Sequence, residues 1–286
     1  MATGYSRVAD LNSLYNDIYE DAVFVAKETS LATRIVRTYT NGKGDQTRTL
    51  SEYPETTPQQ VDEAEDFSNP TRFDKTALAT LTPYEYMSQA ILTDRRAMTD
   101  PQNARNDIAN GLGREMAEYI DKQILNNFSS LTGGTLGASG TSMVWGYLFA
   151  AQSILRANKV PRPYYAVLHP YQWHDIAEDV SVAGSSAVNA PEFQDQVMRE
   201  WYVSNVGGMD GIFVSANVPT SGTDAYGAVF NPWAIAFDLR KDLTLEPERD
   251  ASRRATELNL SVMFATGVWR AAYGCQIITD ITTPTS

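Results

Sequence analysis

The two histidines are the first side chains to weigh for chemistry, because histidine is the commonest metal ligand and a frequent general base. His169 and His174 stand five residues apart, a spacing that does not put them on one helical face, as a two-histidine zinc motif requires. His169 precedes Pro170 and suits the end of a strand, whereas His174 suits a helix surface or a pocket wall. The pattern therefore favours no metal site.

Two other groups have side chains that can take part in chemistry. The acids Asp62, Glu63, Glu65 and Asp66 offer hard oxygen ligands to a divalent cation, but they lack the EF-hand register, which indicates adventitious binding. The single cysteine, Cys275, lies in an apolar sequence typical of a buried strand. It cannot form an internal disulfide, and we expect an inert thiol in a reducing cytoplasm.

The common catalytic motifs are missing from the sequence. There is no Gly-x-Ser-x-Gly elbow, no Gly-x-x-x-x-Gly-Lys-Ser/Thr phosphate loop, and no Gly-x-Gly-x-x-Gly after a predicted strand. We therefore predict no catalytic residue, no cofactor and no enzyme activity. A cytosolic hydrolase stays open as an alternative, because a pair of carboxylates can be catalytic without a recognisable motif.

The length and net charge of the chain limit the classes of protein to which it can belong. With 286 residues and 43% hydrophobic side chains, the chain can bury a large core as one domain or as two that share a sheet. The 23 basic residues against 35 acidic ones give a net charge of −12, which argues against a surface that neutralises many phosphates. Residues 1–28 lack a signal-peptide pattern, and Met143–Leu155 is too short to cross a bilayer, so we expect a soluble protein with no membrane contact.

The segment from Arg34 to Tyr53 is predicted to form a β-hairpin with too little apolar surface for a core of its own. Its turn is expected at Asn41-Gly42-Lys43-Gly44-Asp45, where Asn-Gly supplies the positive φ of a tight turn. An isolated two-stranded ribbon is only marginally stable in water, so another surface, such as that of a neighbouring chain, is needed to stabilise it. The hairpin therefore predicts an assembling protein.

Polar segments lie on both sides of this hairpin. Residues 1–33 are expected to form an arm with one short amphipathic helix, since apolar residues from Leu11 to Ile18 recur at helical spacing. The stretch from Asp45 to Lys75 carries eight acids against three bases, and it is either a solvated loop or a docking surface for a basic partner. Aromatic residues of this N-terminal third fit an interface and the subunit's own core equally well: Tyr15, Tyr19, Tyr39, Tyr53, Phe67, Phe73, Tyr84 and Tyr86.

A long helix is predicted over residues 100–129. Asp100-Pro101 is a strong helix start, because an Asp side chain caps free amides and proline is pre-set for the first helical position. An apolar stripe then runs from Ile108 to Phe128, and Gly133-Gly134 ends the pattern. About 28 residues at 1.5 Å each span about 42 Å. Gly111 and Gly113 lie inside this helix, so we expect close packing or a bend there.

The rest of the chain mixes helices and strands with mostly short connections, which is typical of an α+β fold. A second helix is predicted over Trp145–Ala157, before the breakers Pro161 and Pro163. A glycine-rich turn at 207–210 is expected to join strands in a hairpin. The predicted strands are Tyr164–Leu168, Trp201–Val206, Gly211–Ala216, Gly227–Phe230, Leu258–Phe264 and Tyr273–Ile281, and a short helix starts at Asn231-Pro232.

Three local motifs, taken with this order of elements, carry a resemblance to a known family. They are Tyr164-Tyr165-Ala166-Val167-Leu168-His169-Pro170, then Gly207-Gly208-Met209-Asp210-Gly211-Ile212-Phe213-Val214-Ser215-Ala216-Asn217-Val218-Pro219, and Ala271-Ala272-Tyr273-Gly274-Cys275-Gln276-Ile277-Ile278. A strand that ends in His-Pro, a glycine-bounded hairpin and a late strand with Tyr-Gly are similar to those of tailed-phage major capsid proteins. Over nearly its whole length the chain resembles this family, whose fold is the Hong Kong 97 type that encapsulin shells share.

The resemblance implies a division of the chain into four parts. Residues 1–33 would be the N-terminal arm, and residues 34–76 would be an extended loop that lies on the adjacent subunit. Residues 77–142 and 239–264 would form a peripheral domain with the spine helix 100–129. Residues 143–238 and 265–286 would form an axial domain. Candidate inter-subunit contacts lie on the predicted hairpin: Arg37, Tyr39, Asn41, Lys43, Arg48 and Tyr53.

The resemblance also implies a function. The chain would assemble with copies of itself, as hexamers and pentamers, into an icosahedral shell around packaged double-stranded DNA, and would touch that DNA non-specifically. A scaffolding protein, a portal protein and a decoration protein would be further partners. Assembly would occur in the host cytoplasm, and the protein would reside in the virion. The alternative within the fold is an encapsulin-like compartment that encloses a protein cargo.

Overall fold

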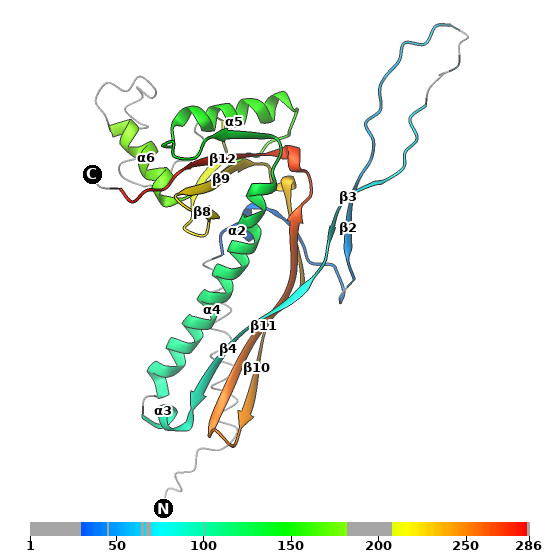
Figure 1. The fold of residues 1–286 in the computed structure, drawn as a ribbon. Helices are drawn as coiled ribbons and strands as arrows, with labels where there is room; N and C mark the ends of the chain where they lie inside the picture. The colour runs from blue at the N-terminus through cyan, green and yellow to red at the C-terminus, as the bar shows by residue number, and fades with distance from the viewer. Residues whose placement is uncertain are drawn as a thin grey trace, which may run out of the picture.

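The computed structural model describes residues 30–44, 46–63, 66, 70–99, 101–181 and 208–284. It has an elongated lower part, a more compact upper part and a thin ribbon that projects from their junction (Figure 1). The predicted arm helix near Leu11, the helix cap at Asp100 and the strand Trp201–Val206 lie outside the described residues.

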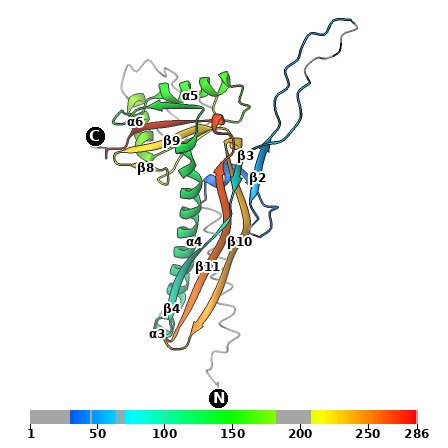
Figure 2. The same cartoon turned by 45° about the vertical axis from the view of Figure 1, so that its right-hand side comes forward.

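The lower part is a long helix packed on one face of a four-stranded sheet. Its strands are β1 (Arg37–Tyr39), β10 (Ile235–Asp250), β11 (Ala255–Val268) and β4 (Tyr84–Thr93), in the order β1-β10-β11-β4. Helix α4 (Pro101–Leu125) runs along this sheet, as Figure 2 shows, and the short helix α3 (Asp94–Thr99) joins it to β4. Alternate side chains of β11, the apolar stripe of α4 and Phe128, just after α4, form the shared core: Ile120, Ile124, Phe128, Leu258, Leu260, Val262 and Phe264.

The upper part is built on a second sheet, which runs β5-β12-β9-β6-β7. These strands are β5 (Gly134–Gly137), β12 (Gly274–Asp280), β9 (Asp224–Phe230), β6 (Tyr165–Leu168) and β7 (Gly211–Val214), and β8 (Thr220–Ser221) pairs with β9. Helices α5 (Trp145–Ala157) and α6 (Pro170–Ser181) pack on this sheet through Trp145, Leu148, Leu155, Trp173 and Ile176. Short 3-10 helices are η1 (Asn126–Ser130), η2 (Pro232–Ala234) and η3 (Ala271–Tyr273).

The third part is a ribbon of two antiparallel strands, β2 (Arg48–Glu52) and β3 (Thr76–Leu81). Its two strands are joined by the residues between 52 and 76, and the described part of this connection extends far from both sheets (Figures 1 and 2). Only its base is buried, where Leu50 and Leu81 pack against Ala236 and Ala265 of the lower sheet. We call residues 53–75 the outer ribbon.

The hairpin predicted over Arg34 to Tyr53 is wrong. Strand β1 pairs in parallel with β10, and β2 pairs with β3, so the two arms of the expected hairpin have different partners. The apolar side chains of Ile35 and Val36 are buried in the core of the lower part, which holds this arm on the body. The turn at Asn41–Gly44 is therefore a connection, in which Gly44 takes a φ of 55°.

Most of the remaining predicted elements are present. The long helix forms as α4 followed by η1, and α5 has the predicted bounds Trp145–Ala157. Asn231 starts η2 as expected, because its side chain accepts a hydrogen bond from the backbone of Trp233. Strand β7 pairs in parallel with β6, and its expected hairpin partner lies outside the described residues. At Gly111 a Cβ would meet no atom within 4 Å, so the expected close packing does not hold there.

The small helix α2 (Ala32–Ile35) is tied to the long helix by a buried carboxylate. Asp121 of α4 accepts hydrogen bonds from the Ser30 hydroxyl and from the backbone amides of Leu31 and Ala32, at 3.0 to 3.1 Å. Burial raises the pKa of this carboxyl above its ordinary value, although the three hydrogen bonds act in the opposite direction. Asp121 thus fixes where residues 30–32 join the lower part.

Candidate assembly surface

Exposed apolar side chains are concentrated in one stretch of the chain. Seven of the ten large apolar side chains that are exposed among the described residues lie between positions 53 and 91. They are Tyr53, Val61, Phe73, Leu78, Tyr84, Met87 and Ile91. An exposed apolar group of this size is typical of a surface that another molecule covers.

The outer ribbon has no core of its own. Every described residue from 53 to 75 is exposed except Pro54, which is half-buried. Its internal contacts are few and lie near the base: the rings of Tyr53 and Phe73 are 6.0 Å apart, and the Lys75 ammonium lies 5.5 Å from the Tyr53 ring. These contacts exclude little water, so the subunit alone gains little from holding this ribbon in one shape.

The base of the ribbon is, by contrast, fixed by a buried carboxylate. Asp238 of β10 is fully buried, and its Oδ2 accepts hydrogen bonds from the Nε atoms of Arg48 and Arg240, both at 2.8 Å. The Arg240 guanidinium also donates to the carbonyl oxygen of Lys43 at 3.2 Å, and Arg48 donates to the Asn41 side chain at 2.7 Å. One acid and two arginines therefore hold both the connection after β1 and the start of β2.

This cluster explains the glycine in the connection. A Cβ on Gly42 would lie 2.4 Å from the guanidinium of Arg240, which is only 3% exposed. A larger residue would displace the arginine that neutralises Asp238. The Asn-Gly pair is thus needed for close approach to Arg240 rather than for a hairpin turn.

The second exposed region is the free edge of the lower sheet. Strand β4 pairs with β11 on one side, and no other described strand pairs with its opposite edge. Met87 and Ile91 are 63% and 49% exposed on this strand, and Tyr84 is 61% exposed at its start. A hollow of about 330 Å³ lies between β4 and α4, with Tyr86, Met87, Ser88, Glu115, Met116 and Tyr119 around it. An edge with apolar side chains and free backbone groups is a site for another chain.

Five of the six candidate contact residues lie at the base of the ribbon. Besides Asn41, Lys43 and Arg48, these are Arg37, whose guanidinium lies 4.7 Å from the Trp233 ring, and Tyr39, whose ring lies 6.3 Å from that of Trp269. Each of the five contacts its own subunit. Tyr53 alone lies on the exposed outer ribbon. Their inter-subunit role stays a prediction.

Several exposed residues were not among the sequence candidates. Phe73 and Leu78 lie on the ribbon, and Met87 and Ile91 lie on β4. The sequence contains a signal for the last two, because a strand from Tyr84 to Thr93 puts Met87 and Ile91 on one face and Tyr86, Ala90 and Leu92 on the other, so both faces carry apolar side chains. Of the aromatic group, Tyr53, Phe73 and Tyr84 are exposed, whereas Tyr86 packs 4.7 Å from the ring of Phe264.

The reactive side chains do not converge on a site. Among the described residues, no three His, Cys, Asp or Glu side chains lie close enough to hold a metal ion. Burial lowers the pKa of His169, and burial raises the pKa of the Cys275 thiol to about 11. Cys275 is fully buried, which fits the expected inert thiol. No helix within the described ranges is long and apolar enough to span a membrane.

A long helix on a sheet, a second α/β part and a projecting two-stranded ribbon define the Hong Kong 97 type of shell protein. The model of the phage capsid protein family matches residues 80–275, and the chain belongs to this family. It is therefore a major capsid protein, which forms the shell of the virion.

Solved structures have the same fold at low sequence identity. A Mycobacterium phage Che8 chain is 16% identical with a TM-score of 0.67, over 87% of this chain and 90% of that one. The capsid of cyanophage P-SCSP1u is 14% identical with a TM-score of 0.68, over 88% of this chain and 89% of that one. A virus-like particle from Pyrococcus furiosus is 8% identical with a TM-score of 0.61, over 92% of this chain and 98% of that one. The comparison with curated proteins finds no match.

Proposed function

We propose that copies of this chain form hexamers and pentamers, which close into an icosahedral shell around double-stranded DNA of a tailed phage. The observation that carries this proposal is the outer ribbon, which exposes Tyr53, Val61 and Phe73 and buries almost nothing in its own subunit. In a shell, each ribbon gains its buried area only when a neighbouring copy arrives. Subunit order and assembly are then coupled.

The free edge of β4 is the surface we propose for the ribbon of a neighbouring copy. Both partners carry exposed apolar side chains, with Phe73 and Leu78 on the ribbon and Met87 and Ile91 on the edge. At about 25 cal/mol per Å² of apolar area, covering a few such side chains gives several kcal/mol per contact. Repeated around a closed lattice, this is enough to make assembly cooperative. The parts of the chain would then act as an N-terminal arm (1–33), an extended loop, a peripheral domain and an axial domain.

The charge of the chain suits a container for DNA. A net charge of −12 disfavours tight binding to phosphates, so contact with the packaged duplex is weak and independent of sequence. We assign the chain a structural role without catalysis. A separate scaffolding protein, a portal protein and a decoration protein complete the particle, and assembly takes place in the host cytoplasm.

The test removes the outer ribbon and leaves its base. Residues 55–73 are replaced by Asn-Gly, which closes β2 and β3 with a two-residue turn. The expected product is a folded, soluble subunit that forms no shells in sedimentation and negative-stain microscopy. Particles of unchanged size and yield would contradict the proposal.

A point variant tests the edge. Met87→Glu puts a charge on the β4 edge, and Val144→Glu puts the same charge on an exposed apolar position of the upper part, at the start of α5. We expect loss of shells for Met87→Glu and normal shells for Val144→Glu. Equal yields from the two variants would rule out the β4 edge. Shells that contain protein cargo rather than DNA would favour the encapsulin-like alternative.

A further inference from the structure

Strand β2 carries a charged residue at each end, and each pairs with the body of the subunit. Arg48 at its start pairs with Asp238 at 2.8 Å, and Glu52 at its end pairs with Arg270 at 2.6 Å. The ribbon is therefore attached at two points, one on β10 and one in the turn that leads to β12. The two attachments differ in how deeply their charged side chains are buried.

The inner attachment is built to stay closed. The Asp238 side chain is fully buried, and Arg48 and Arg240 are 20% and 3% exposed. Opening it would take Arg48 away from a fully buried carboxylate and leave Arg240 as the remaining counter-charge, which is unfavourable. The neighbouring side chains of Leu50 and Leu81 are buried as well.

The outer attachment is built so that it can open. The side chains of Glu52 and Arg270 are 38% and 24% exposed, so water can replace either partner. Arg270 keeps other contacts when Glu52 leaves: it donates to the Tyr273 hydroxyl at 3.2 Å, and its guanidinium lies 4.9 Å from the Tyr273 ring and 5.2 Å from the Trp269 ring. Arg270 is thus held in place as a fixed donor, whether or not the Glu52 carboxylate is bound to it.

A hinge lies between the two attachments. The β2–β3 pairing shifts register between Leu50 and Ser51, which is a bulge or a similar irregularity. Bulges bend a strand and weaken the ladder locally. The ribbon therefore has a point of rotation beyond its buried base and before Glu52.

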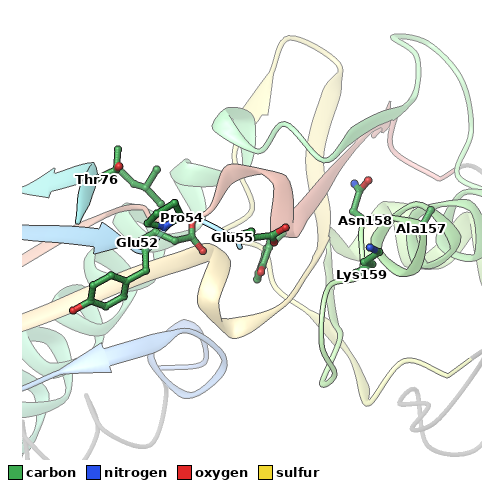
Figure 3. A pocket seen from close by; sticks show the side chains of 10 residues that line it. Glu52, Pro54, Glu55, Thr76, Ala157, Asn158 and Lys159 are labelled. Atoms are coloured by element: carbon green, nitrogen blue, oxygen red, sulfur yellow. The ribbon is translucent and has the colours of Figure 1, made fainter. Parts of the chain in front are cut away.

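There is also space for the ribbon to move. A cavity of about 540 Å³ separates the ribbon from the C-terminal end of α5 (Figure 3). Glu55 lies on the ribbon side and Lys159 on the opposite side of this cavity, as Figure 3 shows. Rotation of the ribbon toward α5 would bring these opposite charges closer together.

We propose that the Glu52–Arg270 pair is a releasable latch that sets the angle of the ribbon, and that Lys159 is the second cationic partner, which binds Glu55 when the latch is open. The ribbon then has two defined positions about the bulge at Leu50/Ser51. This inference rests on the proposed function in one respect, because the ribbon angle decides how a neighbouring copy meets it. The latch itself is a property of the isolated subunit.

The test measures the ribbon angle in unassembled, full-length subunits. Spin labels at Gln59→Cys on the ribbon and Ser153→Cys on α5 report the distance between them by pulsed electron resonance, while the buried Cys275 stays unlabelled. We expect Glu52→Gln to raise the ratio of short to long distances about two- to fivefold, the range expected for ion pairs that are partly exposed. Lys159→Gln, added to Glu52→Gln, should return that ratio to its starting value.

Two controls keep this test decisive. Asp74→Asn removes the exposed Arg72–Asp74 pair farther along the ribbon and should leave the distances unchanged. Raising the salt concentration weakens both exposed ion pairs, so it should reduce the difference between Glu52→Gln and the labelled parent. Distances that do not respond to Glu52→Gln would overturn the latch, as would an equal response to Asp74→Asn. Because no shells are involved, either result is independent of the assembly experiments.

Discussion

The base of the ribbon and its outer part differ in how they are stabilised, although they belong to the same pair of strands. At the base, Leu50 is 4% exposed and Arg48 pairs with the fully buried Asp238. Farther out, Phe73 is 62% exposed and the ion pair Arg72–Asp74 lies in water. The base therefore contributes to the stability of the subunit, and the outer part contributes little to it.

The largest effect on the free energy of unfolding is expected at the buried base of the ribbon. Asp238→Asn leaves two guanidiniums without a counter-charge and should lower the free energy of unfolding of the subunit by about 3 to 5 kcal/mol. Urea unfolding of unassembled protein measures this change. Asp74→Asn is the matched variant in the outer ribbon and should have no measurable effect. If the two variants were equally stable, the base would not be an anchor.

Two leucines on the same ribbon give the next largest effect. Leu50→Ala creates a cavity in the buried base and should cost about 2 to 4 kcal/mol of subunit stability. Leu78→Ala acts on a side chain that is 46% exposed and should change stability by less than about 0.5 kcal/mol, while it reduces the yield of shells. Unfolding and shell yield are measured on both. A stability loss for Leu78→Ala as large as that for Leu50→Ala would remove the distinction between base and outer ribbon.

A smaller, pH-dependent effect is expected at Asp121, the other buried acid that fixes a segment to the body. Because burial raises its pKa in the folded protein, folding favours the protonated form; this contribution is complete below the ordinary value of 3.8 and is lost as pH rises through the raised pKa. The stability of the parent relative to Asp121→Asn should therefore fall as pH rises above about 4. Unfolding curves across this range measure it, and a difference that rises with pH would contradict the sign.

The smallest effect is expected at a half-buried glycine where an added side chain would meet no neighbour. Gly111 lies inside α4, and a Cβ there would meet no neighbouring atom, so Gly111→Ala should stabilise the subunit by about 1 kcal/mol through helix propensity alone. Thermal unfolding of the unassembled subunit checks this. Destabilisation would contradict the open space beside Gly111.

Local patterns in the sequence predicted elements whose stability depends on near neighbours. The apolar stripe and the glycine pair predicted the long helix, and Trp145–Ala157 was predicted with the observed bounds. The apolar surroundings of Cys275 predicted a buried thiol, which the fold places on β12. In each case residues within a few positions determine the structure, because helix and strand periodicity are local properties.

The predicted hairpin does not form, because strand β1 pairs instead with a strand that is far away in the sequence. Asn-Gly is a strong local turn signal, yet Arg48 pairs with Asp238, 190 residues later, and β1 pairs with β10. The candidate inter-subunit contacts consequently lie mostly at the base of the ribbon, whereas Phe73, Met87 and Ile91 carry exposed apolar surface. Local propensity cannot disclose a buried ion pair between distant strands.

By itself, the sequence determined the acidic charge, the α+β content and the long helix, and its motifs carried the resemblance to phage capsid proteins. Only the tertiary structure decided which strand β2 pairs with, and hence which residues form the projecting ribbon and which anchor it. The physical reason is that composition and periodicity are properties of the chain, whereas burial of Asp238 between two arginines exists only after distant strands meet.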